Sequence, residues 1–97
     1  TTQKYWDMYP NDTIEPPRVS DIPVEARDPH SQSLYYHYGQ DKCTLSEQDY
    51  RHARRGYYGM VSYVDDLFGQ LMQALEDSGF SDNTVVLFAS DHGDMIG

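Results

Sequence analysis

The sequence predicts an α/β fold: a long amphipathic helix, then one buried parallel strand, with an irregular proline-rich segment before them. Three observations support this. Residues 1–43 carry all five prolines of the chain. Residues 44–78 contain no proline and repeat apolar side chains at spacings of three and four. Residues 84–90 form a short apolar run rich in β-branched and aromatic side chains, as is typical of a parallel strand covered on both faces.

The proline-rich segment, residues 1–43, shows no helical or alternating period apart from a short helical turn near residues 4–9. We expect residues 10–43 to be mostly irregular and to drape over a larger body. Its aromatic side chains suit packing anchors, although they could also form an aromatic cage for a quaternary ammonium group. These side chains are Tyr5, Trp6, Tyr9, Tyr35, Tyr36 and Tyr38. Packing is the reading we favour.

The helix is expected over residues 45–78. Thr44 and Glu47 have the spacing of a capping box at its start, and Gly79 stands where a left-handed residue would end it. The apolar positions predict one buried stripe. They are Tyr50, Ala53, Tyr57, Met60, Val61, Val64, Phe68, Leu71, Met72 and Leu75.

The charged residues of this helix are interpreted as a solvated face. They are Arg51, Arg54, Arg55, Asp65, Asp66, Glu76 and Asp77. Because Asp65 and Asp66 lie in mid-helix, we do not expect them to pair with Asp91.

The strand, residues 84–89, leads directly to Asp91, His92 and Gly93. In open α/β sheets, ligands and reacting groups gather beyond the carboxyl ends of the strands. A carboxylate and an imidazole at that edge, with a glycine that allows a sharp turn, predict a site for a metal or a reacting group. The alternative is that Asp91 and His92 are a turn carboxylate and a surface histidine. His30, His37 and His52 receive no functional role.

Composition excludes several classes of function. The chain has 97 residues and a formal net charge of −9, and it has no Lys/Arg stripe, so we expect no nucleic-acid partner. It has no apolar run long enough to span a membrane. The single cysteine, Cys43, cannot form an internal disulfide, and no signal-peptide pattern is visible. Since nothing in the chain requires an oxidising compartment, we expect a cytoplasmic location.

The predicted elements do not make a free-standing domain. A helix over residues 45–78 would be about 50 Å long, whereas a compact domain of this size has a radius of gyration of only about 13 Å. A buried parallel strand also needs neighbours on both edges, and residues 1–97 supply one convincing strand. We expect residues 1–97 to be an incomplete part of one larger domain, with residues 44–97 as its helix, strand and site loop.

Several stretches resemble the sulfatase family of the alkaline-phosphatase superfamily, nearest to its branch of bacterial choline-sulfatases. The resemblance to the superfamily rests on residues 54–66, on Gly69 and Leu75, on Asn83-Thr84 and on Ser90-Asp91-His92-Gly93. The resemblance to the choline-sulfatase branch rests on residues 4–9, 28–32 and 90–97. It implies that the chain is a fragment of an alkaline-phosphatase-like α/β/α sandwich that forms a single sulfatase catalytic domain.

The resemblance implies a sulfuric ester hydrolase that converts choline O-sulfate and water to choline and sulfate. Such enzymes use a formylglycine made from a Cys or Ser in a C-x-P/A-x-R motif, together with one divalent cation. The cation is usually Ca²⁺, and Mn²⁺ or Mg²⁺ would also suit a hard oxygen donor. Asp91 and His92 match two ligands of this cation, and no catalytic residue is assigned within residues 1–97. Cys43 does not match the motif, because Leu45 and Glu47 stand where Pro or Ala and Arg are required, so the formylglycine is expected outside this segment.

Other functions remain open at this stage. Within the superfamily they are a phosphonate or phosphodiester monoesterase, which also carries a histidine at the position of His92, and an arylsulfatase. From another class, the chain could be a non-catalytic helical interaction module that adds its strand to a partner's sheet. For the enzyme, we expect a small sulfate ester as substrate and a full-length protein that forms a homo-oligomer.

Overall fold

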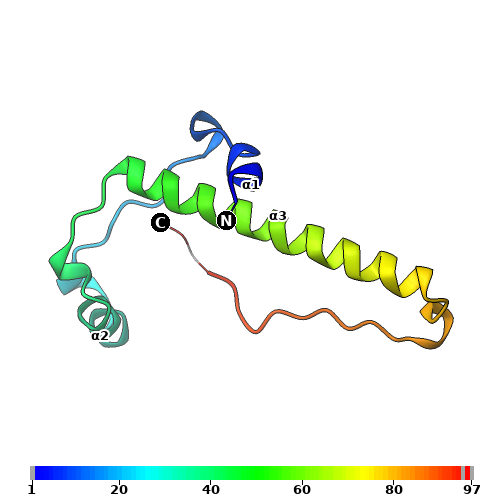
Figure 1. The fold of residues 1–97 in the computed structure, drawn as a ribbon. Coiled ribbons are helices and arrows are strands. Elements are labelled where there is room, and N and C mark those ends of the chain that lie inside the picture. Colours follow the sequence, from blue (N-terminus) through cyan, green and yellow to red (C-terminus); the bar gives the residue numbers. More distant parts are fainter. Residues whose placement is uncertain (1, 95, 97) are drawn as a thin grey trace.

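The computed structural model describes residues 2–94 and residue 96. A long helix, α3, is the main element; α1 and the C-terminal segment lie beside it, whereas α2 lies apart, beyond its N-terminal end (Figure 1). The elements are α1 (Gln3–Asp7), η1 (Asn11–Thr13), η2 (Val24–Ala26), α2 (Pro29–His37), η3 (Gln40–Lys42), α3 (Glu47–Asp77) and η4 (Ser81–Asn83), where η marks a 3₁₀ helix. The radius of gyration is 18.8 Å, well above the value of about 13 Å for a compact domain of this length. The chain is therefore an extended body, as the length of the predicted helix implied.

Helix α3 confirms the predicted helix to within two residues at each end, but its capping box lies two residues later than expected. Ser46, not Thr44, is the N-cap, in extended backbone at φ −81° and ψ 164°. The backbone N–H of Asp49 donates to Ser46 Oγ at 3.2 Å, and the backbone N–H of Ser46 donates to Asp49 Oδ2 at 2.8 Å. Aspartate at the third helical position thus replaces the glutamate of the usual pattern. At the other end Gly79 has φ +73°, which confirms the left-handed position.

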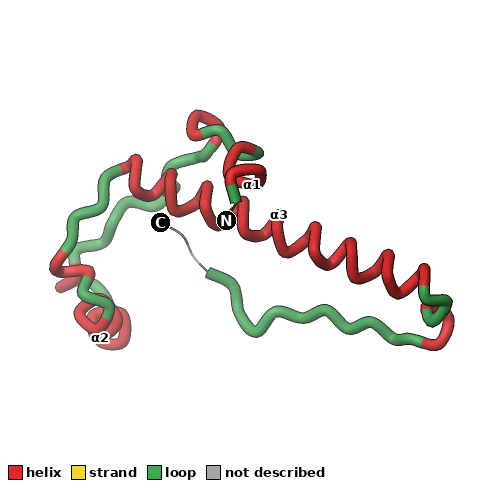
Figure 2. The backbone as a smooth tube through the Cα atoms, in the orientation of Figure 1, coloured by secondary structure: helices red, strands yellow, loops and turns green. Residues whose placement is uncertain are grey.

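The predicted buried strand is not formed. Residues 84–90 are extended loop, and no strand occurs within residues 2–94 (Figure 2). Val85 and Leu87 are 95% and 89% exposed. The physical reason is that a strand is defined by hydrogen bonds to a neighbour, and the described part of the chain offers no second extended segment as a partner. The backbone runs back alongside α3 with Phe88 packed on Phe68, ring centroids 5.2 Å apart.

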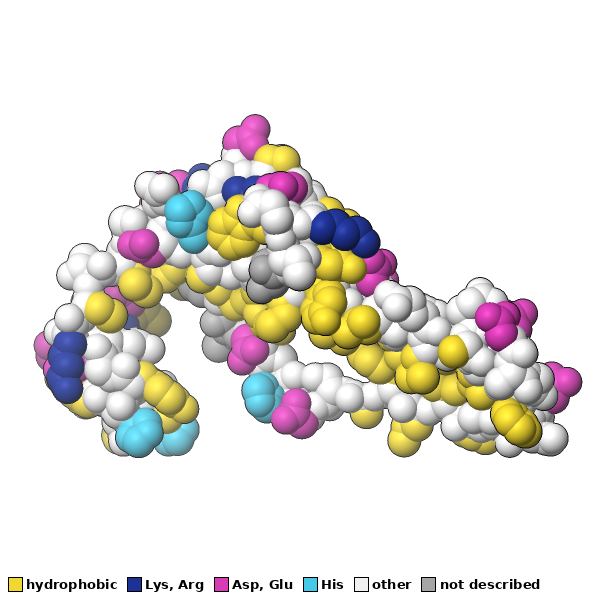
Figure 3. All heavy atoms as spheres, viewed as in Figure 1, with side chains coloured by type: hydrophobic (Ala, Val, Ile, Leu, Met, Phe, Trp, Pro, Cys, Tyr) yellow, Lys and Arg dark blue, Asp and Glu magenta, His cyan; other side chains and the backbone are white. Residues whose placement is uncertain are grey.

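The apolar stripe of α3 exists on one face, but the prediction that it is buried is wrong. Met60, Val61, Val64 and Leu71 are all exposed, and Figure 3 shows apolar side chains along the side of the helix that faces the returning C-terminal segment. Between helix and segment lies an open hollow of about 630 Å³. Its lining residues are Tyr57, Met60, Val61, Val64, Asp65, Phe68, Phe88, Ser90 and Asp94. Within residues 2–94 this apolar face therefore remains open to solvent.

The N-terminal strap, residues 2–18, packs on α3 between Arg51 and Asp66 and confirms the prediction that its aromatic residues act as anchors. Tyr5, Trp6 and Tyr9 each stack on a ring of α3. Their partners are Tyr63, His52 and Tyr58, at centroid distances of 5.4, 6.0 and 5.5 Å. The short α1 confirms the helical turn predicted near residues 4–9.

Helix α2, nine residues long, was not predicted, so the irregular interpretation of residues 10–43 is wrong there. Asp28 caps it by accepting hydrogen bonds from the backbone N–H groups of His30 and Ser31, and Pro29 occupies the first helical position, where its missing N–H costs nothing. The dipeptide Asp28-Pro29 was thus a start signal for a helix. None of the described helices has the length and apolar character needed to cross a membrane.

Candidate functional site

Asp91 and His92 lie at the end of the extended C-terminal segment, in a loop that we call the Asp-His loop (residues 90–94). His92 Nε2 is 3.7 Å from Asp91 Oδ2, and His92 Nδ1 is 3.9 Å from Asp94 Oδ1. The backbone N–H of His92 donates to Asp91 Oδ1 at 3.0 Å, and the Ser90 hydroxyl donates to the carbonyl of His92. The loop therefore places a carboxylate beside each ring nitrogen of one histidine.

The donor set of the Asp-His loop fits part of a metal site. Two ligands that share a cation at roughly 2.0–2.6 Å stand about 3–4 Å from each other, and the 3.7 Å between Asp91 Oδ2 and His92 Nε2 agrees with this. The two side chains are, however, 89% and 71% exposed. Over residues 2–94 and 96, no three His, Cys, Asp or Glu side chains gather closely enough to hold an ion. Within the described residues the loop therefore offers two donors, which is fewer than a bound cation needs.

Asp94 was missed by the sequence reasoning, which stopped at Asp91 and His92. Its carboxylate faces Nδ1 of His92, the ring nitrogen turned away from Asp91. Histidines that bind metals usually have their second ring nitrogen near a carboxylate or carbonyl, and the carbonyl of Gly93 is also 3.4 Å from this nitrogen. The sequence signal that could have pointed to Asp94 is the presence of an acidic residue on each side of His92.

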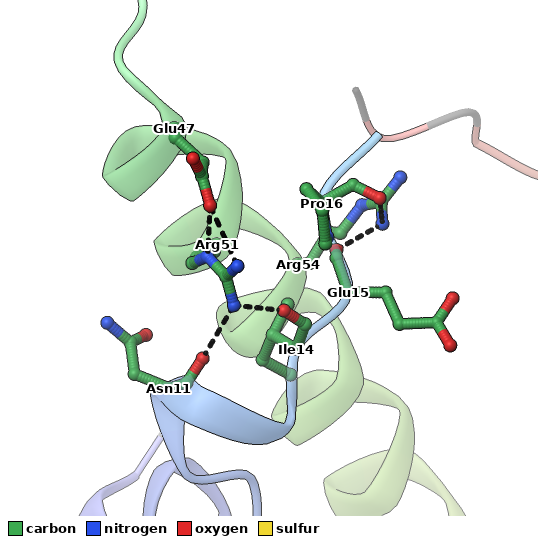
Figure 4. Close-up of polar contacts among 7 residues, drawn as sticks. All are labelled: Asn11, Ile14, Glu15, Pro16, Glu47, Arg51 and Arg54. Atoms are coloured by element: carbon green, nitrogen blue, oxygen red, sulfur yellow. Dashed lines mark hydrogen bonds and ion pairs between the residues drawn. The ribbon is translucent and has the colours of Figure 1, made fainter. Parts of the chain in front are cut away.

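The arginines of α3 do not form the predicted solvated face, which is a correction to the sequence analysis. Arg51 donates through Nη1 to the carbonyls of Asn11, at 3.2 Å, and Ile14 (Figure 4). Arg54 donates through Nη1 to the carbonyls of Glu15 and Pro16, at 2.5 and 3.2 Å. These carbonyls belong to irregular backbone, which lacks the regular hydrogen bonds of a helix or a sheet. Because a guanidinium carries five N–H donors and backbone acceptors need partners, the arginines fasten the strap to the helix.

Two further contacts complete the attachment of the strap. Arg55 is 16% exposed, donates through Nε to the carbonyl of Trp6 at 2.9 Å, and stacks on its ring at 4.5 Å. Asp66 accepts hydrogen bonds from Lys4 Nζ at 2.7 Å and from the Tyr5 hydroxyl at 2.6 Å. The hydrogen bond from Lys4, followed by that from Tyr5, lowers the pKa of Asp66 below its ordinary value. Asp66 thus serves the packing of α1 on α3.

The other residues considered from the sequence have local surroundings of their own. Cys43 is an exposed free thiol in the connection to α3. His52 lies against Trp6 and His37 against Tyr38, while His30 stands in the first turn of α2. Tyr35 and Tyr36 stack edge to face on α2 at 5.2 Å, which is a contact between neighbours and not an enclosing cage.

Comparison with known proteins gives the chain a family. The Sulfatase family model matches residues 10–97. A choline-sulfatase of Rhizobium meliloti is 37% identical over 95 residues, which cover 98% of this chain and 19% of the relative. An arylsulfatase of Clostridium perfringens is 31% identical over 97 residues, or 96% of this chain and 19% of the relative.

A third relative, the multifunctional alkaline phosphatase superfamily protein PehA of Trinickia caryophylli, is 37% identical over 55 residues, or 57% of this chain and 11% of the relative. No solved structure matches the chain significantly. The chain spans about a fifth of the length of the first two relatives. With its family model matched over residues 10–97, the chain belongs to the sulfatase family, whose domain has the alkaline-phosphatase-like fold.

Proposed function

We propose that the full-length protein is a sulfuric ester hydrolase and that its substrate is choline O-sulfate. The observation that carries the proposal is the pairing of Asp91 with His92 at the end of an apolar extended segment, 3.7 Å apart, in a chain whose similarity to a choline-sulfatase covers 98% of its length. A carboxylate and an imidazole in that position are suited to holding a cation next to a sulfate group.

In this proposal Asp91 supplies a charged oxygen and His92 a neutral ring nitrogen to one divalent cation. The oxygen donor favours Ca²⁺ or Mg²⁺, and the imidazole keeps Mn²⁺ within the range of ions that fit. Such a cation supplies positive charge that offsets the negative charge of sulfuryl oxygens. The formylglycine nucleophile and the remaining ligands belong to parts of the protein outside residues 1–97.

The proposal also includes a role for residues 84–89 in the complete domain. There we expect them to be a parallel strand of the α/β/α sandwich, covered on one side by the apolar face of α3. Two features support this. The side chains of Val85 and Leu87 are apolar yet exposed, and the segment already runs alongside α3 with Phe88 against Phe68. A strand between two neighbours would bury these side chains and give the backbone its hydrogen-bond partners.

The test measures bound metal and turnover in the full-length protein and in the variants Asp91→Asn and His92→Ala. We expect both variants to lose metal and activity, because the amide no longer balances the charge of the cation and alanine removes a ligand. His37→Ala on α2 is the matched control and should behave as wild type. If both loop variants keep full metal content and wild-type turnover, Asp91 and His92 are structural residues and the metal site is refuted.

A substrate panel decides the specificity. Choline O-sulfate, 4-nitrophenyl sulfate and a phosphonate monoester are compared by kcat/KM with the metal-loaded protein. The second candidate function is an arylsulfatase, which the similarity to the Clostridium perfringens protein over 96% of this chain favours. A higher kcat/KM for 4-nitrophenyl sulfate than for choline O-sulfate would support that candidate and contradict choline specificity.

A further inference from the structure

Arg54 joins three segments of the chain that are far apart in sequence. Its Nη1 donates to the carbonyls of Glu15 and Pro16 in the strap, at 2.5 and 3.2 Å. Its Nε donates to the carbonyl of Ile96 at 2.7 Å. Ile96 stands four residues after His92, so one side chain on α3 holds both the strap and the backbone that follows the Asp-His loop.

The neighbouring arginines make a useful contrast. Arg51, one turn earlier, donates to strap carbonyls and to Glu47 of its own helix (Figure 4). Arg55 is engaged by Trp6 and Asp7. Among the hydrogen bonds of the described residues, the bond that links this row of guanidinium groups to the C-terminal segment is made by Arg54.

The Asp-His loop has few contacts that fix its position relative to α3, so the hydrogen bond from Arg54 to Ile96 matters for its placement. Its side chains are largely exposed, and its internal hydrogen bonds connect residues one or two positions apart, so they fix local shape without fixing the loop relative to α3. The strap carbonyls, in turn, hold the guanidinium of Arg54 in one orientation. A second hollow, of about 460 Å³, lies where strap, helix and loop meet, and Arg54, Asp94 and Ile96 are among its lining residues.

We propose that Arg54 is a positioning residue that sets the placement of the Asp-His loop relative to α3 and thereby tunes its affinity for the cation. The inference rests on the proposed function, since it assigns the loop to a metal site. Arg54 acts through the backbone of Ile96 and touches neither substrate nor cation. Arginine is required because a single lysine ammonium is a compact donor that does not span the strap and the loop in the same planar arrangement.

The experiment uses the full-length, metal-depleted protein and Mn²⁺ as the probe, with dissociation constants measured by titration calorimetry. Arg54→Ala is compared with Arg51→Ala, which removes strap contacts and leaves the Ile96 contact intact. We expect Arg54→Ala to raise the Mn²⁺ dissociation constant about 10-fold, in the range seen when outer partners of metal ligands are removed. Arg51→Ala should stay within about twofold of wild type. The thermal midpoint of each variant is measured alongside, so that loss of stability is separated from loss of affinity.

Arg54→Lys provides the second variant if Arg54→Ala does not fold. The lysine keeps the positive charge, and we expect the Mn²⁺ dissociation constant of Arg54→Lys to lie between those of wild type and Arg54→Ala. Free guanidinium ion, added to Arg54→Ala, should restore part of its Mn²⁺ affinity. Equal Mn²⁺ affinities in the Arg54 and Arg51 variants, at similar thermal midpoints, would overturn the inference. Failure of the wild-type protein to bind Mn²⁺ or Ca²⁺ would instead refute the proposed function, and the wild-type titration therefore tells the two failures apart.

Discussion

Substitution of Ser46 by alanine should weaken the start of α3, and substitution of Thr44 should not. In the structure Ser46 Oγ accepts a hydrogen bond from the backbone N–H of Asp49 and its hydroxyl donates to the carboxylate of Asp49. Alanine removes both bonds, while Thr44 lies outside the box. Loss of an N-cap serine costs about 1 kcal/mol of helix stability, which is roughly a fivefold change in the helix–coil equilibrium.

The assay is circular dichroism of a peptide with residues 43–78, long enough to be measurably helical by itself. Wild type, Ser46→Ala, Ser46→Asp and Thr44→Ala are compared at several concentrations, because ellipticity that does not change with concentration shows that the peptide is monomeric. We expect Ser46→Ala to lose helicity, Ser46→Asp to retain most of it, and Thr44→Ala to match wild type. Equal loss from Thr44→Ala, or none from Ser46→Ala, would refute the assignment of the cap.

The same peptides give a pH dependence. The hydrogen bond from the Ser46 side chain, with a smaller contribution from its backbone N–H, lowers the pKa of Asp49 below its ordinary value of 3.8. A carboxyl whose folded pKa is lowered stabilises the helix above the unfolded pKa and loses that contribution as the pH falls through the folded pKa. The difference in helicity between wild type and Ser46→Ala should therefore be full above about pH 4 and should shrink at lower pH. A difference that grows on acidification would contradict this.

Two further predictions concern the assembly of the chain. The isolated 97-residue segment should show no sharp two-state thermal transition and no turnover of choline O-sulfate, because among its described apolar residues Tyr5 and Ile14 are the buried ones and one helix cannot cover its own apolar face. A cooperative transition as a monomer, or turnover above background, would refute this. Asp66→Asn should loosen α1 from α3, detected as faster amide hydrogen exchange in residues 3–7. In the wild type the same loosening should begin only at acid pH, as the pH falls through the lowered pKa of Asp66. Equal amide exchange in wild type and Asp66→Asn would show that the contacts of Asp66 with Lys4 and Tyr5 do not hold α1 on α3.

Helix α3 could be predicted from the sequence because its signals are local. The apolar period, the absence of proline and Gly79 all act within a few turns of backbone, and the observed helix ends within two residues of the expected limits. The capping box was assigned to the wrong pair because Thr44 with Glu47 and Ser46 with Asp49 have the same spacing. The extended backbone of Ser46, at φ −81° and ψ 164°, and its reciprocal hydrogen bonds with Asp49 distinguish them.

The features that were missed depend on contacts between distant residues. A strand at residues 84–89 requires hydrogen bonds from other strands, and residues 2–94 supply none, so the apolar pattern alone did not produce the predicted strand. The arginines of α3 have the composition of a solvated face, and their backbone partners in the strap are about forty residues away in sequence. Asp91 and His92 follow from the order of apolar run, carboxylate, imidazole and glycine. The link from Arg54 to Ile96 leaves no such trace, because its acceptor is a backbone carbonyl that every residue carries. A pattern of side chains can therefore suggest candidate ligands such as Asp91 and His92, whose role stays a prediction, while a contact such as that of Arg54 with Ile96 is seen only in the structure.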